Sequence, residues 1–124
     1  MSRSLRVLIV EDEYFVASYV ADLMEEWGHE VMATCPTGEE AIQHLERGGV
    51  EIAILDIKLK GNLTGLDVAE VARAQGVPHL FLSGSGDPTT CSAARATDPL
   101  AFLQKPVSER QLSAILSEVA AECL

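Results

Sequence analysis

Five side chains suited to metal or phosphoryl chemistry stand at or just after the ends of short apolar runs in this sequence of 124 residues. They are three acids, one hydroxyl and one ammonium: Glu11, Asp12, Asp56, Ser83 and Lys105. If the apolar runs are strands of one parallel sheet, their carboxyl ends meet at one edge, which is where ligands bind in open α/β sheets. The spacing therefore predicts that these five side chains share one site.

The chemistry of such a site follows from its charges. Three carboxylates held together repel one another, and a cation relieves that repulsion. Hard oxygen ligands favour Mg²⁺, which binds through one or two carboxylates together with phosphate oxygens. Beside the metal, Asp56 can attack a phosphoryl donor and form an aspartyl phosphate, while Ser83 and Lys105 bind the phosphoryl oxygens.

The elements that must position these residues alternate along the chain as five βα units. Apolar runs predict strands at Leu5 to Val10, His29 to Thr34, Ile52 to Leu55, His79 to Leu82 and Leu100 to Leu103. Amphipathic segments follow each run, and capping patterns at Thr37, Thr64, Asp87-Pro88 and Ser108 open four of the helices. We expect one α/β domain over residues 1–124, a flavodoxin-like doubly wound sheet of five parallel strands in the order 2-1-3-4-5 with five helices.

Composition excludes several classes of function. Nine Lys and Arg against 19 Asp and Glu give a net charge of −10, which argues against binding nucleic acid or an anionic membrane surface. The first apolar stretch is too short for a signal peptide or a membrane span. The odd number of cysteines, at Cys35, Cys91 and Cys123, favours free thiols in the cytoplasm. We expect His29, His44 and His79 to be surface or packing residues.

Glu11-Asp12, Asp56, Ser83 and Lys105-Pro106 together resemble the receiver domain of bacterial two-component response regulators, and the resemblance covers essentially the whole chain. It implies a signalling domain rather than an enzyme, which accepts phosphate on Asp56 from a sensor histidine kinase or phosphotransfer protein. It also implies that Asp12, Asp56 and the Lys58 carbonyl ligate Mg²⁺ and that Glu11 holds a metal-bound water. Phe102 stands where receivers carry an aromatic that changes rotamer, although a core aromatic explains it equally well.

The chain departs from the receiver pattern in two loops. After Asp56, the usual proline and glycine positions hold Lys60 and Thr64, and Gly65 comes one place late. Residues 81–86 resemble the Phe-Ala-Thr-Gly-x-Gly motif of a subgroup of single-domain receivers from alphaproteobacteria. The glycines after Ser83 predict that the fourth helix is mobile or poorly formed. We expect a stand-alone receiver that signals through a partner, onward phosphotransfer or self-assembly such as a homodimer.

Three alternatives use the same architecture. A flavin-binding electron carrier needs a phosphate loop after the first strand, where Glu11, Asp12 and Glu13 would repel the cofactor. A haloacid-dehalogenase-type phosphatase needs an Asp-x-Asp pair there, but Glu13 and Tyr14 follow Asp12. A degenerate receiver that only binds proteins would not need all five chemical residues.

Overall fold

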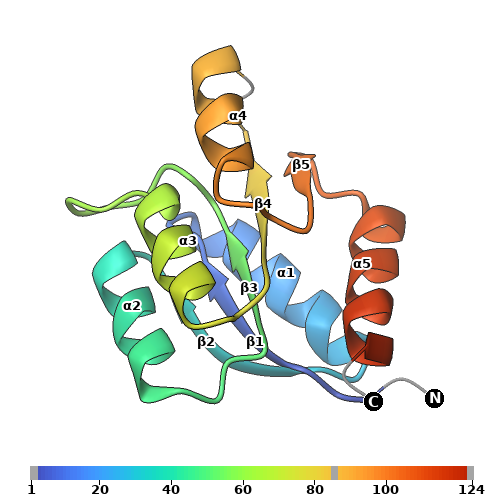
Figure 1. Cartoon of the computed structure of the whole chain (residues 1–124). Coiled ribbons are helices and arrows are strands. Elements are labelled where there is room, and N and C mark those ends of the chain that lie inside the picture. Colours follow the sequence, from blue (N-terminus) through green and yellow to red (C-terminus); the bar gives the residue numbers. More distant parts are fainter. Residues whose placement is uncertain (1–2, 85–86, 123–124) are drawn as a thin grey trace.

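The fold is a five-stranded parallel sheet with helices on both faces (Figure 1). The computed structural model describes residues 3–84 and 87–122. The strand order is β2-β1-β3-β4-β5, as predicted. The strands are β1 (Arg6–Val10), β2 (Glu30–Cys35), β3 (Ile52–Leu55), β4 (His79–Ser83) and β5 (Phe102–Gln104). Strand order reverses between β1 and β3, so their carboxyl ends form the expected ligand edge.

Two helices cover each face of the sheet, and each pair closes one half of the core. Helices α1 (Tyr14–Glu26) and α5 (Glu109–Glu122) lie on one face, and α2 (Gly38–Arg47) and α3 (Gly65–Ala74) lie on the other (Figure 1). Because both faces of the central strands are covered, every residue of β3 is buried. This explains why the strand reads as a continuous apolar run rather than an alternating one.

The predicted caps begin the helices by accepting backbone N–H groups. Thr37 accepts from Glu40 N at 3.2 Å, and Asp87 accepts from Thr90 N at 2.9 Å. Thr64 forms a full capping box with Asp67, whose carboxylate accepts the Thr64 N–H at 2.8 Å. These bonds satisfy donors that a helix N-terminus leaves unpaired, so local sequence alone fixes where these helices begin.

The structure corrects the predicted start of the fifth strand. The fifth strand begins at Phe102, not at Leu100: the Leu100 N–H donates to the His79 carbonyl of β4 at 2.8 Å, but its side chain is exposed and does not belong to a buried strand. The fourth helix is present as α4 (Pro88–Arg95), and its mobility stays a prediction. It stands beyond the carboxyl edge of the sheet, and only its Ala94 is buried (Figure 1).

Two further expectations concern the thiols and the membrane. Cys35 is buried and Cys91 is half-buried, and both are free thiols, whereas Cys123 lies outside the described residues. Burial raises the pKa of the Cys35 thiol to about 11, with a smaller contribution from Glu40, so that thiol is unreactive at neutral pH. Over the described ranges, each helix is too short or too polar to cross a bilayer.

Candidate functional site

The ladder between β1 and β3 places Glu11, Asp12 and Asp56 side by side. Val10 pairs with Leu55 in this ladder, Glu11 directly follows Val10, and Asp56 directly follows Leu55. The Asp56 N–H donates to the Val10 carbonyl at 2.8 Å, and the Glu11 N–H donates to Cys35 in the neighbouring strand at 2.9 Å. These backbone hydrogen bonds therefore hold Glu11 and Asp56, the acids that directly follow β1 and β3, in register.

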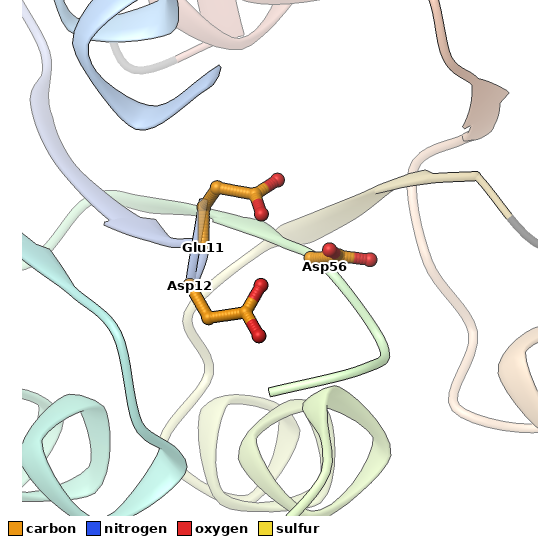
Figure 2. Close-up of side chains that lie close together, drawn as sticks. All are labelled: Glu11, Asp12 and Asp56. Carbon is orange, nitrogen blue, oxygen red and sulfur yellow. The ribbon is translucent and has the colours of Figure 1, made fainter. Parts of the chain in front are cut away.

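The three carboxylates gather at the carboxyl edge of the sheet (Figure 2). One oxygen from each of Glu11, Asp12 and Asp56 lies within 4.8 Å of the others. Glu11 and Asp56 are buried, with 6% and 7% of their surface exposed, whereas Asp12 is half-buried. Burial is the main cause that raises the pKa of Glu11 above its usual value, and hydrogen bonds from Lys105 and the Glu13 N–H partly offset it.

Lys105 is the cation that the structure supplies to this cluster. Its Nζ lies 2.7 Å from Glu11 Oε1 and 3.1 Å from Asp56 Oδ2. The Lys105 N–H also donates to the Ser83 carbonyl at 2.9 Å, which ties its position to β4. Burial alone would lower the pKa of Lys105, but the bonds to Glu11 and Asp56 outweigh it and raise that pKa. The ammonium therefore stays charged and neutralises one of the three negative charges.

The Asp56 carboxylate is held at both oxygens. Its Oδ1 accepts the Ile57 N–H at 2.7 Å, and its Oδ2 faces Lys105. These two donors, one on each oxygen, fix the plane of the carboxylate, and both bonds are charge-assisted. The Asp56 carboxylate is thus held in one orientation rather than free to rotate.

The site opens into a pocket of about 510 Å³ at the carboxyl edge of the sheet. The residues around it are Asp12, Glu13, Asp56, Lys58, Ser83, Gly84 and Lys105. It thus brings together five of the predicted site residues, and Glu11 lies beside them through its bond to Lys105. Ser83 is 1% exposed overall. Ser85, two residues after Ser83, lies outside the described residues.

Phe102 is placed away from this pocket. Its ring packs against Phe81 with centroids 6.0 Å apart, and it lines a separate groove with Cys91 and Arg95 of α4. The ring is half-buried, which fits either a core aromatic or a side chain with room to move.

The pocket also contains residues that the sequence did not single out. Glu13 and Gly84 line it, and Gly65 lies against the main chain of Asp56. Glu13 directly follows the predicted acidic pair, so its adjacency was the available signal. No pattern within the β3–α3 segment shows that Gly65 reaches Asp56, because that contact depends on how α3 docks.

Comparisons with known proteins agree with this geometry. The sequence model of the response regulator receiver domain matches residues 7–117. The transcriptional regulatory protein PdtaR of Mycobacterium tuberculosis is 31% identical over 104 residues, which cover 83% of this chain and 50% of that protein. The two-component response regulator PhoP of Pseudomonas aeruginosa is 32% identical over 118 residues, covering 91% of this chain and 50% of PhoP. This chain thus spans about half the length of these relatives.

Solved structures share the whole architecture. The signal receiver domain of a modulated diguanylate cyclase from Desulfovibrio desulfuricans matches with a TM-score of 0.90 and 30% identity, covering 97% of this chain and 96% of that one. A CheY-like receiver domain protein from Methanospirillum hungatei shares the fold, with a TM-score of 0.86, 24% identity and coverage of 97% and 96% of the two chains. Sequence model, relatives and fold agree, and the chain belongs to the response regulator receiver domain family.

Proposed function

We propose that this chain accepts a phosphoryl group on Asp56 from the phosphohistidine of a sensor histidine kinase or a phosphotransfer protein. The family is a signalling domain rather than a conventional enzyme. The observation that carries the proposal is the oriented Asp56 carboxylate, which lies in one pocket with Asp12 and Lys105. We assign the receiver domain to residues 1–124, working in the cytoplasm.

The transfer is a displacement at phosphorus. An oxygen of Asp56 forms the new O–P bond while the N–P bond of the donor breaks, and the electron pair of that bond stays on the departing imidazole. The bond from the Ile57 N–H keeps the carboxylate plane fixed during attack. Lys105 and Ser83, which line the same pocket, bind the phosphoryl oxygens as their charge increases.

The three carboxylates fit Mg²⁺, because their hard oxygen atoms lie close together and the ammonium of Lys105 balances one of their three negative charges. We assign Asp12, Asp56 and the Lys58 carbonyl as ligands, with Glu11 holding a metal-bound water. When bound, the metal neutralises charge on the phosphoryl oxygens and the acids. The half-buried Asp12 faces the pocket, and the ion pairs of Lys105 with Glu11 and Asp56 do not include it. Of the three acids, Asp12 therefore has the greatest need of a cation.

The signal leaves by a change of contacts. Phosphorylation draws Lys105 toward the new phosphoryl oxygens, and because Lys105 is bonded to β4, the change reaches the β4–β5 side of the sheet. There Phe102 packs on Phe81 beside α4, where a change of ring rotamer would alter the surface of the groove. We propose that a stand-alone receiver of this kind signals through a protein partner, onward phosphotransfer or a homodimer.

Acetyl phosphate with Mg²⁺ tests the proposal directly. Intact mass measurement should show one added phosphoryl group on the wild type and none on Asp56→Asn. Asp22→Asn, which changes an exposed acid of α1, is the matched control and should be phosphorylated like the wild type. Equal phosphorylation of Asp56→Asn would overturn the proposal. A visible absorption band of bound flavin, or steady turnover of a phosphate ester, would favour the two rejected classes.

A further inference from the structure

Gly65, the first residue of α3, lies closer to the main chain of Asp56 than any side chain would permit. A Cβ added to Gly65 would lie 1.9 Å from the Asp56 carbonyl oxygen and 2.8 Å from the carbonyl carbon. Real Cβ atoms essentially never approach a neighbour within 3.0 Å. The backbone of Gly65 is not in a left-handed conformation, so this close approach is the reason for glycine here.

The peptide unit that Gly65 touches is the one that orients the Asp56 carboxylate. The Asp56 carbonyl and the Ile57 N–H belong to one planar group, which rotates as a rigid unit. The carbonyl end of this unit lies against Gly65, and the N–H end donates to Asp56 Oδ1 at 2.7 Å. A push on the carbonyl therefore swings the N–H away from the carboxylate.

A second bond fixes the same segment from α3. The Gly65 N–H donates to the Ile57 carbonyl at 2.8 Å. The first residue of α3 therefore contacts two successive peptide units, one by packing and one by a hydrogen bond. Together these contacts join the helix to the strand end that carries Asp56.

We infer that Gly65 is a positioning residue for the Asp56 carboxylate and acts through the Asp56–Ile57 peptide unit. The inference rests on the proposed function, in which Asp56 is the phosphoacceptor. The extra residue in the β3–α3 loop does not remove this contact, because Gly65 occupies the position against the Asp56 carbonyl although it comes one place late. Displacement of the carboxylate is expected to slow transfer, since reacting groups must be held in a narrow range of geometry.

Gly38 provides a matched control within the same molecule. It is the first residue of α2, follows the N-cap Thr37 as Gly65 follows the N-cap Thr64, and is buried like Gly65. A Cβ at Gly38 would lie 2.8 Å from the Leu63 Cβ, so alanine there also crowds the packing between α2 and α3. It does not press on the Asp56–Ile57 peptide unit.

The test compares Gly65→Ala with Gly38→Ala after melting curves have established that both are folded. With acetyl phosphate and Mg²⁺, Gly65→Ala should be phosphorylated about ten- to a hundredfold more slowly than the wild type, and Gly38→Ala at close to the wild-type rate. The Ile57 amide resonance should move in Gly65→Ala alone. A wild-type rate, or a slow rate with an unmoved Ile57 amide, overturns the inference.

A second comparison needs no substitution of glycine and holds if Gly65→Ala does not fold. Replacing Asp56 by Asn changes the acceptor of the Ile57 N–H, so the amide resonances of both Ile57 and Gly65 should shift, while that of Gly38 stays. An unmoved Gly65 amide would show that the two peptide units are not joined and would overturn the inference. If the wild type is not phosphorylated, the proposed function fails, and these amide resonances still decide the positioning role.

Discussion

At the scale of single residues, the charge balance of the site depends on which of its three acids pair with Lys105. Lys105 pairs with Glu11 and Asp56 at 2.7 and 3.1 Å, which leaves Asp12 to face the pocket. The first two acids are therefore stabilised by the protein itself, and the third is stabilised by whatever cation enters. We therefore make separate predictions for Asp12, for Lys105 and for Lys58, which also lines the pocket.

Asp12→Ala should abolish Mg²⁺ binding and raise stability in the absence of metal. Removing one carboxylate from the cluster relieves repulsion worth about 1 kcal/mol, the Coulomb energy of one pair of charges 4 Å apart in water. Calorimetric Mg²⁺ titration and melting in a chelator measure the two effects. Asp22→Ala removes the same charge from the exposed face of α1 and should change neither. Unaltered Mg²⁺ affinity in Asp12→Ala would refute its role as a ligand.

Lys105→Met should lower the free energy of unfolding by about 1–3 kcal/mol, because it leaves Glu11 and Asp56 without their ammonium donor. The loss should be smaller in an Asp56→Asn background, where only Glu11 remains charged beside it. Urea unfolding of the four proteins gives the coupling between Lys105 and Asp56. A loss of the same size in both backgrounds would mean that their ion pair contributes nothing.

Lys58 is exposed and lines the pocket, so its ammonium can contact a phosphoryl oxygen and obstruct the attacking water. Lys58→Ala should shorten the lifetime of the aspartyl phosphate about tenfold, which corresponds to about 1.4 kcal/mol of barrier. Loss of phosphate from the purified phosphoprotein measures this lifetime. Lys60→Ala changes a nearby exposed lysine that does not line the pocket and serves as the control. An unchanged or longer lifetime in Lys58→Ala would place its side chain in solvent.

At the scale of elements, His29 connects the start of the sheet to the turn after α1. The Leu5 N–H donates to His29 Nδ1 at 3.0 Å, a bond that requires the neutral imidazole because an imidazolium has no acceptor nitrogen. Burial lowers the pKa of His29 below its usual value of 6.5. The unfolded chain therefore takes up the proton first as the pH falls, and stability present above about pH 6.5 is lost below it.

His29→Asn should reduce that loss of stability. The asparagine side-chain oxygen can accept the Leu5 N–H without titrating, so the fall in unfolding free energy from pH 7 to pH 5 should shrink by about 1 kcal/mol or less, the net value of one hydrogen bond. Urea unfolding at the two pH values measures it. His44→Asn on α2 removes a histidine without touching this bond and should retain the wild-type fall. Equal pH dependence in His29→Asn and the wild type would contradict the assignment.

The elements also show which features a sequence can predict. Strand β3 has the predicted bounds because four buried apolar residues are flanked by polar ones, and the caps at Thr37 and Thr64 act locally. Strand β5 was predicted too early because Leu100 is apolar yet 45% exposed. An edge strand such as β5 has a neighbouring strand on one side only and is less buried, so the apolar pattern predicts its bounds less well.

At the scale of the whole molecule, the topology converts scattered residues into one site. Glu11, Asp56, Ser83 and Lys105 come from four segments of the chain, and the rule for the carboxyl edge of a parallel sheet predicted their meeting. Two features were beyond such reasoning. The Lys105 bond to Glu11 and the Gly65 contact with Asp56 depend on how side chains and helices dock, which strand order does not specify.

We propose that Asp56, and neither of the other two acids, carries the phosphoryl group. After treatment with acetyl phosphate and Mg²⁺, borohydride reduces an aspartyl phosphate to homoserine, which peptide mass mapping then locates. We expect homoserine at position 56 alone, because Asp56 is the acid oriented by both Ile57 and Lys105. Reduced product at Glu11 or Asp12, or modification that persists in Asp56→Asn, would contradict it.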